Sequence, residues 1–302
     1  MKAFEKRPLG KTGEKVTFLG FGALEIGRDW GLGNADQKRR PDEQTACKVL
    51  NGVLDMGINI IDTARAYHRS EERIGLCIGH RRKEYFLASK CGEHSCEPDT
   101  YYDFSYDAVK KSIDMSLKLL KTDCIDLMQI HFGPDPHKVL DDGETLAAMK
   151  DAQKEGKIRF LGASCDGDVA KRCIQSGEFD VIQMHYNLLH RDNSENIEEC
   201  GKKGIGVLIR GGLGAGLLTP RVIPHLNEIQ EKEKIAALLD LVKGNGDMLT
   251  AIALNFLYRN DNISSVLVGS KNPDHVMDNV KLLEVEISED VYNEALKIAG
   301  IN

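Results

Sequence analysis

Short hydrophobic runs alternate with amphipathic helical segments along the whole chain. Eight of these runs have the length and composition of buried parallel strands: Phe18–Ala23, Ile58–Ile61, Phe86–Lys90, Ile125–Ile130, Phe160–Ser164, Val181–His185, Gly206–Ile209 and Val266–Gly269. Segments with helical periodicity lie between and after them: Glu43–Met56, Ser70–Ile78, Tyr106–Leu120, Gly143–Glu155, Gly167–Ser176, Asn193–Lys203, Lys234–Val242 with Leu249–Arg259, and Pro273–Leu282. This alternation predicts an α/β fold with a parallel sheet.

The number of units favours a closed barrel. Dividing 302 residues by eight leaves about 38 for each unit, which is enough for a strand, a helix and two loops. No Pro/Ser-rich linker interrupts the alternation, so we expect one domain over residues 1–302. The alternative is a doubly wound open sheet, whose first strand normally leads into GxGxxG, and Gly20-Phe21-Gly22-Ala23-Leu24 does not match that motif. The sequence therefore predicts a single (β/α)8 TIM barrel.

Two segments lie outside this repeat. Arg7–Leu9 and Val16–Thr17 flank Gly10-Lys11-Thr12-Gly13, which predicts an N-terminal β-hairpin that could close one end of the barrel. Gly211–Gln230, after the seventh strand, is a long loop with several glycines and prolines. Loops that follow barrel strands build the active sites of this fold, so we expect this loop to contribute to function.

Composition and charge narrow the possible partners and compartments. The chain is 41% hydrophobic and 29% charged, and its net charge of −7 provides no basic patch for nucleic acid or an anionic membrane. No apolar run is long enough to span a bilayer, and Met1 to Gly13 does not resemble a signal peptide. We therefore expect a cytoplasmic protein.

The eight cysteines are scattered and form no CxxC pair. In a cytoplasmic protein they are interpreted as reduced thiols that mostly fill the core. Cys91, His94 and Cys96 lie close together, but a fourth ligand is not evident and we expect no metal.

Polar residues end three of the predicted strands. Asp62 follows the second strand, with Tyr67 five residues later, Lys90 ends the third strand and His131 follows the fourth. A lysine ammonium next to a tyrosine lowers the pKa of the phenol, and a carboxylate can hold that ammonium in place. Tyr67 would then be a general acid, and His131 could orient a substrate carbonyl. Each residue also has an ordinary structural interpretation, as a helix cap, a paired lysine or a core aromatic, and spacing alone leaves both interpretations open.

The sequence resembles the aldo-keto reductase family over almost its whole length. Four segments carry the resemblance: Arg7–Gly13 with Leu19–Gly22, Gly57–Tyr67 with Ser70–Gly75, Ser116–Asp123 with Ile125–Leu127 and His131, and Gly156–Ser164. The resemblance implies NAD(P)H-dependent reduction of an aldehyde or ketone, with Asp62, Tyr67, Lys90 and His131 as the catalytic tetrad. It also implies that Trp30, Tyr67 and His131 contact the substrate.

A nicotinamide cofactor across the barrel mouth follows from the same resemblance. The residues expected to bind it are Gly22, Ala23, Leu24, Asp62, Ser164, Cys165, Gln183, Arg210, Gly211, Gly212, Leu213, Gly214, Gly269, Ser270, Lys271, His275, Asp278 and Asn279. Lys271 suits a 2′-phosphate and favours NADP(H), with NAD(H) as the alternative. Cys165 stands where the family commonly has asparagine, and Arg210 where many members stack an aromatic ring on the nicotinamide.

Two other functions remain open at this point. The chain could be a nicotinamide-binding regulatory subunit with slow or vestigial reductase activity, because Cys165 and Arg210 could weaken catalysis. It could also be a Schiff-base aldolase with Lys90 as the nucleophile, although the spacing of Asp62 and Tyr67 would then be unexplained. The sequence identifies neither the carbonyl substrate nor the oligomeric state.

Overall fold

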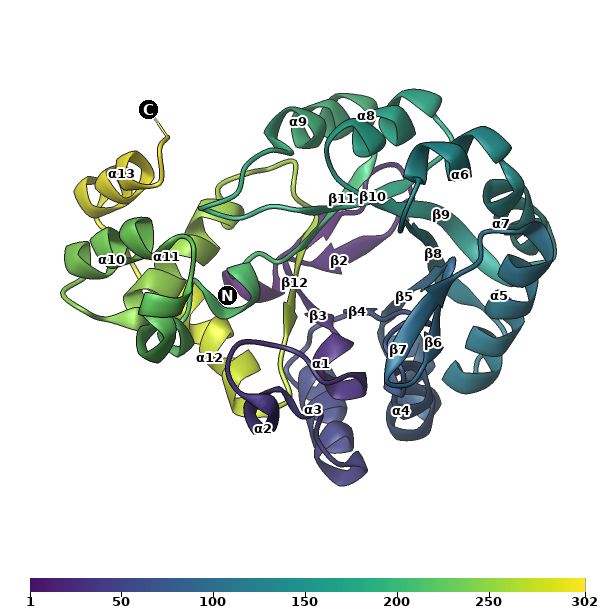
Figure 1. Cartoon of the computed structure of the whole chain (residues 1–302), viewed down its shortest axis with the longest axis horizontal. Coiled ribbons are helices and arrows are strands. Elements are labelled where there is room, and N and C mark those ends of the chain that lie inside the picture. The colour runs from purple at the N-terminus through teal and green to yellow at the C-terminus, as the bar shows by residue number, and fades with distance from the viewer. Residues whose placement is uncertain (302) are drawn as a thin grey trace.

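Eight parallel strands close into a barrel in the computed structural model, which describes residues 1–301. Around the barrel the order is β10 (Val181–His185), β11 (Gly206–Arg210), β12 (Ser265–Gly269), β3 (Leu19–Gly22), β4 (Ile60–Asp62), β5 (Phe86–Cys91), β8 (Ile125–His131) and β9 (Ile158–Ser164). Figure 1 shows this ring of strands with helices around its outside. The predicted (β/α)8 barrel is confirmed, and each predicted strand is present with its ends shifted by at most two residues. Asn302, the last residue of the predicted domain, lies outside the described residues.

The strands are buried on both faces because helices cover their outer side and side chains fill the interior. Every residue of β4 and β5 is buried, and the inward-facing cluster includes Ile60, Leu127 and Leu208. Strands that are buried on both faces consist mostly of hydrophobic residues, and this is why the hydrophobic pattern of the sequence predicted their positions.

Thirteen α-helices are found in residues 1–301. They are α1 (Leu24–Gly27), α2 (Ala35–Lys38), α3 (Glu43–Asp55), α4 (Ser70–Ile78), α5 (Tyr106–Leu120), α6 (Pro136–Asp142), α7 (Glu144–Lys154), α8 (Gly167–Ser176), α9 (Ser194–Lys203), α10 (Lys232–Leu241), α11 (Gly246–Tyr258), α12 (Pro273–Leu283) and α13 (Glu289–Ile298). The nine helical segments predicted from the sequence are all present. The long loop after β11 is folded into 3-10 turns at Gly214–Gly216 and Pro220–Glu228.

An N-terminal hairpin closes the end of the barrel opposite the carboxyl ends of the strands. Its strands β1 (Lys6–Pro8) and β2 (Lys15–Thr17) pair antiparallel, and its turn lies against the start of β11, where Lys11 N–H donates to the Gly204 carbonyl at 2.8 Å. Leu9 and Val16 are buried among the interior side chains of the barrel. The predicted hairpin is therefore confirmed, and the barrel opens only at the other end.

Several elements were not predicted. A second hairpin, β6 (Glu93–Cys96) and β7 (Asp99–Tyr102), follows β5 directly and stands beside the barrel mouth. The helices α1, α2 and α6 occupy loops, and α13 ends the described chain. In Figure 1, α13 lies with α10 and α11 at the side of the barrel, and the three helices share a separate apolar cluster that includes Leu238, Ile252 and Ala295.

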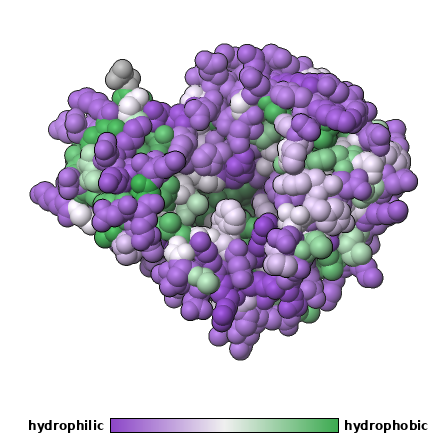
Figure 2. Space-filling view, in the orientation of Figure 1, coloured by the Kyte–Doolittle hydropathy of each residue, from purple (hydrophilic) through white to green (hydrophobic). Residues whose placement is uncertain are grey.

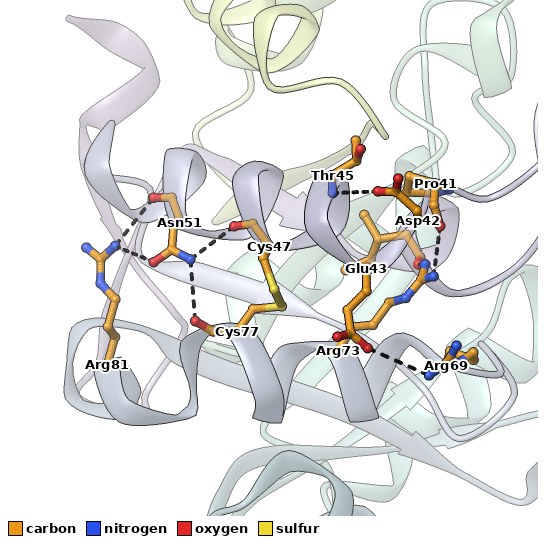
Figure 3. The surroundings of a disulfide bond; sticks show 11 residues. Pro41, Asp42, Glu43, Thr45, Cys47, Asn51, Arg69, Arg73, Cys77 and Arg81 are labelled. Carbon is orange, nitrogen blue, oxygen red and sulfur yellow. Dashed lines mark hydrogen bonds and ion pairs between the residues drawn. A yellow bond between two sulfur atoms is a disulfide. The ribbon is translucent and has the colours of Figure 1, made fainter.

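The prediction that all cysteines are reduced is wrong for one pair. Cys47 of α3 and Cys77 of α4 form a disulfide with a Cα–Cα distance of 5.0 Å, as Figure 3 shows. The two residues are 30 positions apart, and they meet because α3 and α4 pack side by side outside β4. Sequence spacing does not reveal such a contact.

No helix within residues 1–301 is long and apolar enough to cross a membrane.

Candidate active site

The polar ends of three neighbouring strands meet at the open mouth of the barrel. Asp62 is the last residue of β4, Lys90 lies near the end of β5 and His131 is the last residue of β8. Because the strands are parallel and in register, with Asp62 beside Ala88, their carboxyl ends lie at one face. Tyr67, in the loop between β4 and α4, completes the group.

Lys90 is the centre of a buried hydrogen-bond network. Its ammonium donates to Asp62 Oδ2 at 2.5 Å, to the Thr63 carbonyl at 3.0 Å and to the Tyr67 hydroxyl at 3.2 Å. The lysine is 1% exposed, so all three donors of its ammonium have protein partners. The structure thus brings together Asp62, Tyr67 and Lys90, three of the four residues of the predicted tetrad.

Two amides hold the carboxylate that anchors this network. Asp62 Oδ1 accepts hydrogen bonds from Gln129 Nε2 at 2.9 Å and from Gln183 Nε2 at 2.8 Å. With Lys90 on the other oxygen, the carboxylate is fixed from three sides. Asp62 therefore positions Lys90 toward Tyr67.

Burial changes the acidity that the sequence led us to expect for Tyr67. Burial raises the pKa of the phenol above its ordinary value of 10.0, and the Lys90 ammonium opposes this rise without overcoming it. For Lys90, burial is the largest influence and opposes the charged form, but Asp62 and Tyr67 together outweigh it and raise the pKa of the lysine. At neutral pH the site therefore holds a protonated phenol against a charged ammonium, the state from which Tyr67 can donate a proton.

A glutamate that the sequence analysis did not identify stands beside His131. Glu93, in β6, is 8% exposed, and its Oε2 lies 2.8 Å from His131 Nδ1. Its other oxygen, Oε1, accepts a hydrogen bond from Thr100 at 2.6 Å. Burial opposes the charge of Glu93, but His131 and Thr100 outweigh it and lower the pKa of this carboxyl to about 2. Glu93 is therefore a carboxylate at any neutral pH, and it leaves the Nε2 atom of His131 available to a substrate.

Replacing Glu93 with glutamine should lower kcat/KM for carbonyl reduction about tenfold at pH 7. Burial lowers the pKa of His131, and Glu93 opposes that effect. Without the carboxylate the pKa of His131 falls further, so the acid limb of the pH–rate profile should move to lower pH. Asp99→Asn, in the second strand of the same hairpin, is the control because Asp99 is exposed and its carboxylate has no ion pair or hydrogen bond with the described residues. An unchanged pH profile in Glu93→Gln would contradict this role.

One cavity of about 800 Å³ opens at the mouth and extends across it. Figure 2 shows a hollow near the middle of this view, inside the ring of strands. Three of the tetrad residues and Trp30 line its substrate end, together with three residues that were not predicted, Arg28, Glu93 and Phe132. The substrate contacts expected for Trp30, Tyr67 and His131 are thus possible from their placement.

Most residues expected to bind a cofactor line the same cavity. These are Gly22, Leu24, Asp62, Ser164, Gln183, Arg210, Gly211, Gly212, Leu213, Gly269, Ser270, His275, Asp278 and Asn279. Four others do not line it: Ala23, Cys165, Gly214 and Lys271. The Cys165 thiol lies 4.0 Å from that of Cys173 in α8, so it faces the helix layer. Lys271 donates to the backbone carbonyls of Gln37 and Arg39, the latter at 2.8 Å.

The cavity wall suits a long dinucleotide. At Gly211, where φ is +65°, a Cβ would lie 2.4 Å from the His185 ring, so only glycine fits and the backbone itself forms the wall. Gln183 and Ser164 present an amide and a hydroxyl at one end. At the other end, the first turns of α12 contribute His275 and Asn279, and a helix N-terminus favours a phosphate.

The charge of Arg210 is neutralised by an ion pair. Its guanidinium contacts the Asp166 carboxylate, which also accepts from the His185 backbone N–H at 2.7 Å and from Asn193 at 2.8 Å. Arg210 therefore lies fixed in the cavity wall, where the family often has an aromatic ring.

The cysteine and histidine residues near Lys90 have other partners. His94 stacks on Tyr101 and its Nε2 lies 3.2 Å from the Asp103 carbonyl, while the Cys91 thiol faces the Gln129 carbonyl. Among residues 1–301, no three His, Cys, Asp or Glu side chains are grouped so that they could hold a metal ion.

Comparison with known proteins identifies the family. Residues 19–299 match the model of the aldo/keto reductase family. The chain is 32% identical to L-galactose dehydrogenase from Arabidopsis thaliana over 296 residues, 93% of this chain and 88% of the relative. It is 26% identical to the NADH-specific methylglyoxal reductase of Escherichia coli, over 94% of this chain and 95% of the relative. The holo structure of aldo-keto reductase AKR11C1 from Bacillus halodurans superposes with a TM-score of 0.81 at 27% identity, covering 99% of this chain and 98% of that one. The chain therefore belongs to the aldo/keto reductase family.

Proposed function

We propose that this protein reduces an aldehyde or ketone to the alcohol with NAD(P)H, and that Tyr67 is the general acid. The observation that carries the proposal is the hydrogen bond from the buried Lys90 ammonium to the Tyr67 hydroxyl at 3.2 Å, in the wall of the large cavity. When bound, a nicotinamide cofactor supplies the hydride that adds to the carbonyl carbon. As negative charge develops on the carbonyl oxygen, Tyr67 donates its phenolic proton to that oxygen. Lys90 then stabilises the phenolate that remains.

The charge state of Lys90 argues against a Schiff-base aldolase. A nucleophilic lysine needs a lowered pKa so that a free amine is available. Here Lys90 is held by Asp62, which raises the pKa of its amine. The lysine therefore serves the proposed reductase as a cation.

An NADPH- and NADH-oxidation assay against aliphatic and aromatic aldehydes, aldoses, methylglyoxal and quinones tests the function. We expect many turnovers per enzyme with at least one aldehyde or ketone. Multiple turnover would also argue against the regulatory subunit with vestigial activity. Failure of every carbonyl compound with both cofactors would contradict the proposal.

We expect a preference for NADPH over NADH of about tenfold in KM, based on Lys271. This lysine does not line the cavity but follows Gly269 and Ser270, which do, and its ammonium would suit a 2′-phosphate at this end. The preference is moderate because the ammonium would have to exchange its two backbone carbonyls for the phosphate. A second reason for a moderate preference is that Glu25, an acidic residue, lines the same end of the cavity as the expected phosphate. Comparing KM for the two cofactors in the native protein and in Lys271→Met tests this, with Lys281→Met, at the far end of α12, as the control. Equal KM values in the native protein would refute it.

A further inference from the structure

Charged groups at the substrate end of the cavity are almost all matched by opposite charges. Three close pairs account for them: Lys90 with Asp62, His131 with Glu93, and Arg210 with Asp166. Arg28 is the exception. It lines the same cavity and is half-buried, yet its guanidinium has no ion pair or hydrogen bond with any residue in the described part of the chain. Five donors on one planar group are thus available to a ligand.

The backbone next to Arg28 is fixed against the loop that carries Tyr67. A Cβ on the preceding residue, Gly27, would lie 2.1 Å from the Tyr67 carbonyl oxygen, so the two segments touch. The Gly27 carbonyl accepts a hydrogen bond from Arg40 at 2.8 Å, and Arg40 also pairs with Glu97 at the tip of the β6–β7 hairpin. Arg28 therefore extends from a position that is tied both to the catalytic loop and to the hairpin beside His131.

Arg28 acts on the substrate end of the cavity and not on the end lined by α12. Burial is the main cause that lowers the pKa of His68, and the charge of Arg28 is the next largest. Arg28 also lowers the pKa of Glu93, but less than His131 and Thr100 do, while burial raises it. At the opposite end, the charges that affect Glu25 are those of Arg221, Lys271 and His275. Arg28 is therefore close enough to His68 and Glu93 to act at their end of the cavity.

We propose that Arg28 binds a carboxylate of the carbonyl substrate, so that this enzyme prefers aldehydes or ketones that carry a carboxyl group. The inference rests on the reductase function proposed above and names its substrate class. A guanidinium binds a carboxylate through two parallel hydrogen bonds. A carboxylate fits better than a phosphate dianion, because one arginine provides a single positive charge and the Glu93 carboxylate is nearby. Trp30 and Phe132, in the same wall, would cover the carbon skeleton between the two groups.

Two pairs of substrates test the proposal, each an acid and its methyl ester: 4-carboxybenzaldehyde with methyl 4-formylbenzoate, and 4-oxobutanoate with methyl 4-oxobutanoate. In the native protein, kcat/KM should be at least tenfold higher for the acid of at least one pair, mainly through a lower KM. In Arg28→Gln this ratio should fall to about one, while kcat/KM for the ester stays within about twofold of the native value. Arg28→Lys should recover part of the ratio because it keeps the charge but not the paired hydrogen bonds.

Arg39→Gln is the control variant. Arg39 lies on the same loop, pairs with Asp36 and does not line the cavity, so its replacement should leave the ratio unchanged. Thermal melting of Arg28→Gln verifies that the variant folds. Equal kcat/KM for acid and ester of both pairs in the native protein would overturn the proposal and leave the reductase function standing. A high ratio that persists in Arg28→Gln would also overturn it. Absence of turnover of all four compounds, and of the wider carbonyl panel, would overturn the reductase function and this inference with it.

Discussion

Replacing Tyr67 with phenylalanine should lower kcat for carbonyl reduction by about a thousandfold or more. A positioned general acid contributes between 10² and 10⁴ to a rate, and the cavity wall contains no second phenol or ammonium next to Lys90 that could take over, within residues 1–301. The substitution removes one oxygen and leaves the aromatic ring in place. Cofactor affinity should therefore stay within about twofold of the native value, because the residues expected to bind the cofactor are unchanged.

Single-turnover kinetics and a fluorescence titration with NADPH measure the two quantities separately. Tyr101→Phe, on the exposed hairpin strand β7, is the matched control because it removes the same atom away from Lys90. If Tyr67→Phe kept more than a tenth of the native kcat, another residue would have to supply the proton. The assignment of Tyr67 as the acid would then be abandoned.

Loss of the disulfide between Cys47 and Cys77 should cost the fold about 3 to 4 kcal/mol of unfolding free energy. A cross-link that closes a loop of 30 residues restricts the unfolded chain by about that amount in the chain-entropy model. Figure 3 shows that polar contacts reinforce the pair, since Asn51 Nδ2 donates to the Cys47 carbonyl at 3.0 Å and to the Cys77 carbonyl at 3.4 Å. The contact between Asn51 and Cys77 joins α3 to α4 even when the cysteines are reduced, so we expect a less stable fold and not an unfolded one.

Denaturant unfolding of the native protein, with and without a reductant, measures this difference on one sequence. The double variant Cys47→Ala/Cys77→Ala should unfold like the reduced protein and should not respond to the reductant. Cys124→Ala, at a half-buried free cysteine, is the control and should keep the response. Identical unfolding of the oxidised and reduced native protein would show that the bond contributes nothing. The cytoplasmic location inferred from the sequence stays a prediction, and the redox state of this pair in the cell bears on it.

The barrel could be predicted from the sequence because its strands are buried on both faces. The predicted segment Val181–His185, for example, begins and ends at the same residues as β10 in the structure. The hairpin of β6 and β7 could not be found in this way. Glu93-His94-Ser95-Cys96 and Asp99-Thr100-Tyr101-Tyr102 are polar and do not alternate, and β7 is mostly exposed. By contrast, the start of α13 could have been predicted from Ser288, a residue type that favours helix N-termini. Its side chain caps α13 by accepting a hydrogen bond from Val291 N–H.

The proposed catalytic group could be predicted from the sequence because the strand ends converge in this fold. The residues that surround this group could not be predicted in the same way. Glu93 meets His131 across 38 residues of chain through a hairpin that had not been predicted. Cys165 was expected to face a cofactor from its place after β9, but position along the chain does not tell which way a side chain points. The acidity of Tyr67 also depends on burial, which only the folded cavity determines.

The way the barrel closes has a consequence for the synthesis of the protein. The residues of the proposed catalytic tetrad have all been synthesised by His131. The first strand of the barrel, β3, pairs with β4 but also needs β12, the last strand of the barrel. Val266 N–H donates to the Phe18 carbonyl at 2.7 Å, a contact that joins the beginning of the barrel to its last strand. When only the first half of the chain has left the ribosome, these four residues therefore lie on an incomplete sheet whose two outer strands, β3 and β8, still lack their barrel neighbours β12 and β9. Activity should appear only late in translation, after Ser265–Gly269 has emerged, and the nascent chain is most exposed to aggregation in the interval before that.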